Sequence, residues 1–151
     1  MAAKTFFLEI VSPERKVFSQ DIEFAVFPGA EGQFGVLPHH APMLCALQPG
    51  EIKILRDKQA DYFAVSGGFL EVSANKVTVV ADACEAPSEI NAAEALAEKK
   101  SALEDLQKTH EKNAVALARQ KLMIAEVRIK VAAKTVGQGN HQPSEAGTSQ
   151  Q

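Results

Sequence analysis

The sequence lacks tryptophan, has only two cysteines and contains no long apolar run, and each shortage excludes a class of protein. Cys45 and Cys84 lie far apart and outside any CxxC spacing, so they do not indicate a disulfide scaffold or a zinc module. We expect buried free thiols in a reducing compartment. No segment reaches the ~18 apolar residues of a membrane span, and the N-terminus does not resemble a signal or transit peptide. Direct membrane insertion is therefore not expected.

Basic charge and catalytic motifs are also missing. The formal net charge is −3, which does not favour a nucleic-acid partner. His39-His40 has no carboxylate or cysteine at a spacing that completes a metal site, and no nucleophile has a supporting base. The glycines of Gly29-x-x-Gly32-x-x-Gly35 are not followed by the Lys-Ser/Thr of a phosphate loop. We therefore expect no enzymatic activity, no metal and no cofactor.

The first half of the chain has the two-residue period of β-strands. Candidate strands at 6–10, 22–26, 52–55, 62–65, 69–72 and 76–81 are separated by turn residues such as Pro-Gly and Gly-Gly. Short strands at this spacing indicate an antiparallel β-sandwich or barrel. The alternation predicts these inward-facing residues: Phe6, Leu8, Ile10, Ile22, Phe24, Val26, Ile52 and Ile54.

The composition changes after Pro87. No glycine or proline occurs between Ser88 and Lys134, and Ala, Glu, Lys and Leu dominate. Ser88 is a candidate N-cap of a first helix, whose apolar stripe contains Leu96 and Leu103, with Ala92, Ala95 and Leu106 on the same side. The apolar pattern lapses over 109–113, which predicts two helices joined by a polar turn. The expected fold is α+β (β then α): an antiparallel β-sandwich at 1–86, an antiparallel two-helix hairpin at 87–134 and a disordered tail at 135–151.

The second predicted helix has two apolar stripes about half a turn apart. One contains Val115, Leu122 and Ile129, with small seam residues at Ala118, Ala125 and Ala132; the other contains Leu117, Ile124 and Val131. Small seam residues allow a partner helix to approach closely. The two stripes are compatible with a helix held between its hairpin partner and the sandwich. They are also compatible with a helix that buries different faces in two conformations.

Two sequence blocks carry a resemblance to a known family. The first is Gly29-Ala30-Glu31-Gly32-Gln33-Phe34-Gly35-Val36-Leu37-Pro38-His39-His40-Ala41-Pro42, and the second runs from Val65-Ser66-Gly67-Gly68-Phe69-Leu70-Glu71-Val72 to Asp82. Over residues 4 to 134 the chain resembles the epsilon subunit of the F-type ATP synthase, of the bacterial type. The resemblance implies a non-catalytic rotor subunit in the central stalk, which couples ion movement through the c-ring to ATP synthesis. The hairpin would restrain ATP hydrolysis.

The resemblance also implies partners and contact residues. Gly29, Ala30, Glu31 and Gly32 correspond to the loop that meets the c-ring, and His40, Ala41 and Pro42 to a segment near the gamma subunit. In the second helix, Arg119, Lys121, Arg128 and Lys130 correspond to cations that would meet the alpha/beta catalytic head. The implied location is the cytoplasmic face of the bacterial cell membrane, reached peripherally through the complex.

A nucleotide motif found in some relatives is degenerate in this chain. The form Ile/Leu-Asp-x-x-Arg-Ala aligns with Ile90-Asn91-Ala92-Ala93-Glu94-Ala95, so Asn91 replaces the acid and Glu94 replaces the cation. A carboxylate beside an anionic nucleotide is repulsive, and we expect poor ATP binding. Two other hypotheses are a free-standing adaptor whose hairpin docks a different partner and an ATP-sensing protein.

Overall fold

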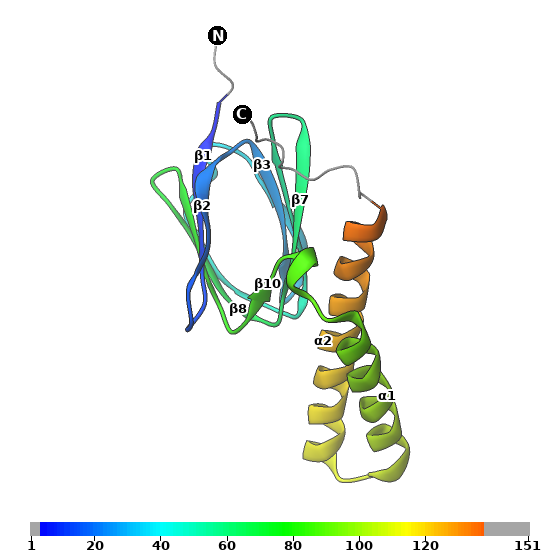
Figure 1. The fold of residues 1–151 in the computed structure, drawn as a ribbon. Coiled ribbons are helices and arrows are strands. Elements are labelled where there is room, and N and C mark those ends of the chain that lie inside the picture. Colours follow the sequence, from blue (N-terminus) through cyan, green and yellow to red (C-terminus); the bar gives the residue numbers. More distant parts are fainter. Residues whose placement is uncertain (1–3, 138–151) are drawn as a thin grey trace.

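The computed structural model describes residues 4–137, in which a β-sandwich is followed by two antiparallel helices (Figure 1). The strands are β1 (Phe6–Val11), β2 (Lys16–Ile22), β3 (Phe24–Gly29), β4 (Gly32–Val36), β5 (Met43–Leu47), β6 (Gly50–Arg56), β7 (Gln59–Val65), β8 (Gly68–Ser73), β9 (Lys76–Ala81) and β10 (Cys84–Glu85). A 3₁₀ turn, η1 (Pro87–Glu89), leads to α1 (Ala92–Lys108) and α2 (Lys112–Gly137). The predicted turn near 109–113 is confirmed. Helix α2 extends three residues into the predicted tail, and the rest of that tail lies outside the described residues.

The strands form one continuous hydrogen-bonded sheet, which folds over into two layers. The order is β10-β7-β6-β3-β5-β8-β9-β1-β2, with β4 paired to β3. All pairs are antiparallel except β1 with β9, which run parallel with Leu8 opposite Val77 and Ile10 opposite Val79. The first strand therefore lies between the ninth strand and the second.

The core confirms most of the predicted alternation and corrects one segment. Phe6, Leu8, Ile10, Ile52 and Ile54 are buried, as predicted. Segment 22–26 is not one strand, because β2 ends at Ile22 and β3 begins at Phe24. The bend at Glu23 changes which residues face inward. Ala25 and Phe27 are fully buried, whereas Phe24 and Val26 are half-buried.

Backbone conformation explains the glycine-marked block before β8 and the tight turn after it. Gly68 has a φ of +139°, and a Cβ there would collide with the carbonyl oxygen of Val80 on β9. Ala74 and Asn75 both have positive φ in the two-residue turn between β8 and β9. Two consecutive left-handed residues match the right-handed twist of paired strands. Asn75 also donates from Nδ2 to the carbonyl of Thr5 at 3.0 Å, which ties this turn to β1.

Helix α1 begins three residues later than the sequence predicted. Its N-cap is Asn91, whose Oδ1 accepts a hydrogen bond from the Glu94 amide at 3.0 Å. Ser88 instead lies within the 3₁₀ turn that begins at Pro87. Ile90, between the two elements, is extended, with φ −82° and ψ 127°, so the helix cannot start before it.

The two helices pack through small residues rather than leucines. The buried positions along their contact are Ala95, Ala102, Ala118 and Ala125. Leu96 and Leu103, predicted on the apolar stripe of α1, are 57% and 43% exposed, so the prediction is wrong for these leucines and confirmed for Ala95 of the same stripe. Alanine seams permit a close approach of the helices, which turns the adjacent leucines outward. The predicted small seam of α2 is confirmed at Ala118 and Ala125.

Candidate functional site

The loop predicted to meet the c-ring is a two-residue turn between β3 and β4. Gly29 pairs with Gly32 across the hairpin, and Ala30 and Glu31 form the exposed tip. Gly32 has a φ of +137°, which favours glycine. A Cβ at Gly29 would lie 2.7 Å from the Gly32 carbonyl oxygen, so both glycines hold the tip in place. Glu31 is therefore presented to solvent on a tightly constrained turn.

Exposed apolar side chains gather on the outer face of β5, β8 and β9. Strand register places Ala46 opposite Phe69, and Phe69 opposite Val80. Phe69 is 60% exposed and Leu44, on β5, is 74% exposed. We call Leu44, Ala46, Phe69 and Val80 the outer apolar patch. Exposed apolar groups that are contiguous on one sheet face are typical of protein interfaces.

His40, Ala41 and Pro42 lead directly into this outer apolar patch, because β5 begins at Met43. The Nδ1 atom of His40 lies 2.7 Å from the carbonyl oxygen of Ala41, and the neighbouring His39 amide donates to Asn75 Oδ1 at 2.7 Å. The sequence predicts a gamma contact at His40, Ala41 and Pro42, but it does not reveal the outer apolar patch. Ala46 and Phe69 are 23 positions apart, and their pairing becomes visible only in the strand register.

The hairpin packs on the other layer of the sandwich, through α2. Val131 is fully buried against Ala64 of β7 and Ile90, with Tyr62, Val127 and Ala132 around them. Figure 1 shows the C-terminal part of α2 beside β7, while the α1–α2 turn projects away from the sandwich. The apolar part of this contact is small. Of the second apolar stripe of α2, this contact buries Val131 completely, whereas Leu117 remains 54% exposed.

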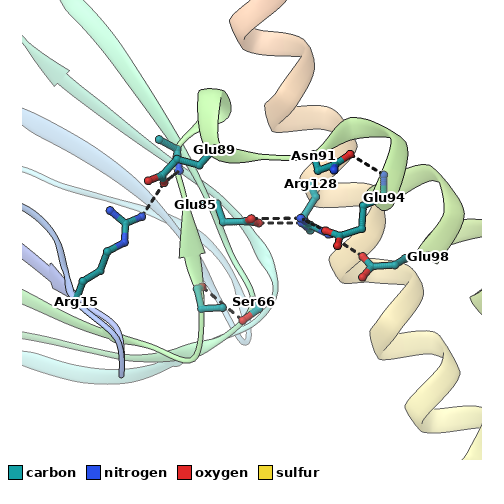
Figure 2. Close-up of polar contacts among 10 residues, drawn as sticks. Arg15, Ser66, Glu85, Glu89, Asn91, Glu94, Glu98 and Arg128 are labelled. Carbon is teal, nitrogen blue, oxygen red and sulfur yellow. Dashed lines mark hydrogen bonds and ion pairs between the residues drawn. The ribbon is translucent and has the colours of Figure 1, made fainter.

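Arg128 of α2 joins three parts of the chain through one guanidinium (Figure 2). Its Nε and Nη2 atoms donate to both carboxylate oxygens of Glu85 on β10, at 2.8 and 3.2 Å. Nη2 also donates to Glu94 at 2.9 Å and Nη1 to Glu98 at 2.7 Å, both on α1. The side chain of Arg128 is only 12% exposed. We call these four residues the Arg128 cluster.

The carboxylates stabilise the charged form of Arg128 despite its burial. Burial alone would lower the pKa of the guanidinium, but the hydrogen bonds that it donates to Glu85 and Glu94 and the charges of Glu85 and Glu98 outweigh burial and raise the pKa. Bidentate arginine–carboxylate pairs combine charge with fixed geometry. The cluster contains three carboxylates and one cation, so it depends on Arg128 to offset repulsion among its acids.

A second, weaker set of charges supports the same contact. Glu51 of β6 lies 3.6 Å from Lys130 and 3.8 Å from Lys134, distances that are too long for strong hydrogen bonds. The ammonium of Lys134 also lies 4.5 Å from the ring centre of Tyr62. The side chain of Lys130 is 67% exposed, so its pairing with Glu51 is a rim contact.

The linker between the sandwich and the hairpin is fixed by Glu89. Its carboxylate accepts hydrogen bonds from the Ala86 amide at 2.8 Å and from Arg15 at 2.7 Å (Figure 2). Arg15 lies just before β2, the strand at the opposite end of the strand order from β10, so the linker is attached to both ends of that order. The direction in which the chain leaves β10 is therefore set before α1 begins.

The four predicted cations of the second helix are not equivalent. Arg119 and Lys121 are exposed, and neither takes part in an ion pair within residues 4–137. Arg128 and Lys130 instead contact acids of the sandwich. Among the cations that the structure describes on this helix, Arg119 and Lys121 are thus exposed and without an ion pair, whereas Arg128 is held within the Arg128 cluster.

The degenerate nucleotide motif has become part of the hairpin's own structure. Ile90 packs against the sandwich, Asn91 caps α1, and Ala95 lies in the alanine seam. Glu94, at the position of the motif's cation, bonds Arg128. The Glu94 carboxylate is thus hydrogen-bonded to the Arg128 guanidinium, at the place where an anionic ligand would need a cation.

Both cysteines are free, and their burial differs. Cys84 is buried, and burial raises the pKa of its thiol to about 12. Cys45 is half-buried rather than buried as predicted, because the edge of β5 leaves it partly open. No group of three or more His, Cys, Asp or Glu residues with the spacing of a metal site occurs within residues 4–137. No helix in this described range is long and apolar enough to cross a membrane.

A β-sandwich that carries a docked two-helix hairpin defines the class of this chain, and comparisons with known proteins give its family. Residues 5–87 match the family described as ATP synthase, Delta/Epsilon chain, beta-sandwich domain. The ATP synthase epsilon chain of Pelotomaculum thermopropionicum is 49% identical over 72% of this chain and 81% of the relative. That of Syntrophobacter fumaroxidans is 41% identical over 85% and 96%. The chain belongs to the ATP synthase epsilon chain family.

Solved structures share the fold at lower sequence identity. A chain of the Euglena gracilis mitochondrial ATP synthase, from a structure of OSCP, F1 and c-ring, aligns with a TM-score of 0.74 and 20% identity. The match covers 85% of this chain and 81% of the other. A chain of the Tetrahymena thermophila central stalk and c-ring aligns with a TM-score of 0.65 and 16% identity, covering 87% and 99%. At these identities the likeness concerns the fold.

Proposed function

We propose that this chain is the epsilon subunit of a bacterial F-type ATP synthase, a non-catalytic part of the central-stalk rotor. It would couple ion movement through the c-ring to ATP synthesis by way of the gamma subunit. The observation that carries the proposal is family membership across both the sandwich and the hairpin, since the epsilon-chain relatives align over 81% and 96% of their own length. The complex would hold the chain peripherally at the cytoplasmic face of the cell membrane.

The outer apolar patch supports a gamma interface on the layer away from the hairpin. Leu44, Ala46, Phe69 and Val80 form a flat apolar surface, and the His40–Pro42 segment lies at its edge. A stable partner would bury these side chains and gain from their removal from water. The β3–β4 turn, with Glu31 at its tip, supports a separate polar contact with the c-ring. The two contacts would fix the sandwich at the foot of the stalk.

The hairpin supports a regulatory role toward the alpha/beta catalytic head. Leu96, Leu103 and Leu117 remain exposed when the hairpin is docked, although its alanine seam is satisfied. An extended hairpin would place these leucines and the exposed Arg119 and Lys121 against partner surfaces. Restraint of ATP hydrolysis would follow from occupation of the head by the extended second helix.

A pull-down from the native membrane fraction tests this function. A tagged full chain should retain gamma and the alpha/beta head in a single complex of fixed stoichiometry. The variant Phe69→Glu tests the interface, because it places a charge in the outer apolar patch. It should release gamma while leaving the fold intact. If the wild-type chain is recovered as a monomer without these partners, the free-standing adaptor hypothesis replaces the proposal.

A further inference from the structure

The strongest unexplained feature is the concentration of buried charge at the junction of the sandwich and both helices. One guanidinium in the Arg128 cluster uses Nε, Nη1 and Nη2 in four hydrogen bonds to three carboxylates. Its partners come from β10 and from α1, so the same side chain links the sandwich to α2 and α2 to α1. The apolar contact beside it buries only Val131 completely among the residues of α2 that it contains.

We propose that the Arg128 cluster is an intramolecular clamp that keeps the hairpin docked without any bound ligand. Breaking the pairing with Glu85 is then the obligatory step before the hairpin can leave the sandwich. The regulatory meaning of the clamp rests on the proposed function, but its existence does not.

The composition of the cluster explains why Arg128 would control docking. Removing the cation leaves three carboxylates close together in a partly buried place, where like charges repel strongly. Removing Glu85 has a different effect, because Arg128 keeps Glu94 and Glu98 and the helices stay joined. The link across the domain junction alone is then lost. The pairing of Arg128 with Glu85 is also sensitive to salt, since the side chain of Glu85 is 32% exposed to solvent.

The chain contains its own reporter of docking. Tyr62 is the only tyrosine, tryptophan is absent, and Tyr62 packs beside Val131 in the docking contact. Because Tyr62 belongs to β7, a change in tyrosine fluorescence that precedes unfolding of the sandwich in a urea titration of the isolated full chain reports undocking, with helical circular dichroism as a second signal.

Arg128→Gln is expected to raise the population of undocked hairpin about tenfold, equal to ~1.4 kcal/mol. Glu85→Gln should raise it in the same direction while the helical signal is retained. Arg119→Gln, the same charge change on an exposed residue of α2, is the matched control and should leave the curve at the wild-type position. Added NaCl should undock the wild-type hairpin and have little effect on Arg128→Gln.

The clamp is refuted if Arg128→Gln and Glu85→Gln both titrate like the wild type, or if Arg119→Gln shifts the curve equally. In the reconstituted synthase, Glu85→Gln should deepen restraint of hydrolysis, because it frees the hairpin and keeps every cation. Undocking in the isolated chain with unchanged hydrolysis in the complex would support the clamp and contradict the proposed regulatory function.

Discussion

At the residue scale, the Glu94 side chain favours an ion pair within the chain over the binding of an anionic nucleotide. Its carboxylate accepts a hydrogen bond from Arg128. The side chain of Asn91, at the start of the same turn, accepts a hydrogen bond from the Glu94 amide. Both side chains are therefore used by the hairpin itself. An anionic nucleotide at this place would meet a carboxylate and would compete with three acids for one arginine.

We therefore expect no saturable binding of ATP to the isolated chain at about 1 mM nucleotide, which corresponds to less than ~4 kcal/mol of binding free energy. Isothermal titration calorimetry with MgATP measures this directly. Glu94→Gln, which removes the repulsive charge without adding a cation, is a useful comparison and should also bind negligibly. Saturable heats with amide shifts clustered at residues 90–95 would contradict the expectation.

Glu31 is a second residue whose setting predicts its effect. It stands at the exposed tip of the β3–β4 turn, and exposed ion pairs contribute about 0–1 kcal/mol each. Glu31→Lys should weaken coupling between ion flow and ATP synthesis modestly, without unfolding the sandwich. ATP-driven pumping in membrane vesicles measures the coupling.

Asp21→Lys is the control for Glu31→Lys, because Asp21 pairs with Phe7 near the β8–β9 turn, at the other end of the strands from the β3–β4 turn. It makes the same charge change and should leave pumping unchanged. Wild-type pumping and wild-type salt dependence in Glu31→Lys would rule out the placement of this turn at the c-ring.

The buried thiol of Cys84 gives the sandwich a defined alkaline limit. Burial raises its pKa from 9.0 to about 12 in the folded state, so the folded protein retains a proton that the unfolded chain releases. Its contribution to stability is complete below about pH 9 and is lost between about pH 9 and 12. Cys84→Ala should therefore lose less stability between pH 8 and 11, by urea denaturation, than the wild type loses. Cys45→Ala should follow the wild type more closely, and parallel losses in all three proteins would exclude Cys84 as the cause.

At the element scale, local patterns predict the strands well and the helix faces less well. Phe6, Leu8 and Ile10 alternate because one face of β1 is buried, so the sequence period reports burial directly. The predicted stripe of α1 combined Leu96 and Leu103 with Ala95, and of these three only Ala95 is buried, because the small side chains of Ala95 and Ala102 make the helix contact. The sequence predicts Arg128 only as a cation that meets the catalytic head. Its partners within the chain are not predicted, because Glu85 and Glu98 lie 43 and 30 positions away in sequence.

Helix α2 divides its cations between docking and restraint, and this division can be tested. Truncation after Pro87 should raise ATP hydrolysis by removing the whole hairpin. Arg119→Ala/Lys121→Ala should reproduce part of that rise with the hairpin still docked, because neither residue has an ion pair within residues 4–137. Steady-state ATPase assays of the reconstituted complex measure both. A double variant with wild-type hydrolysis would leave the exposed cations without a role in restraint.

At the scale of the whole molecule, the sandwich contains a core of its own. Its main buried cluster runs from Phe6 to Cys84 and includes no residue of either helix. The fragment of residues 1–86 should be soluble, unfold cooperatively and bind gamma, since the outer apolar patch remains intact. Thermal unfolding by circular dichroism and co-purification with gamma measure these properties. Aggregation of the fragment, or gamma binding that requires the hairpin, would contradict the division at 86/87.

The parallel pairing of β1 with β9 has a consequence for biosynthesis. A ribosome releases β1 first, yet one of its two neighbours in the sheet ends at Ala81. The apolar face of Phe6, Leu8 and Ile10 must therefore remain incompletely covered until most of the sandwich has emerged. Closing so long a loop is entropically unfavourable and slow compared with forming the neighbouring β8–β9 hairpin. Folding of the nascent chain should thus begin at the β8–β9 hairpin and finish with the docking of β1. Strand β1 therefore remains available to chaperones for most of translation.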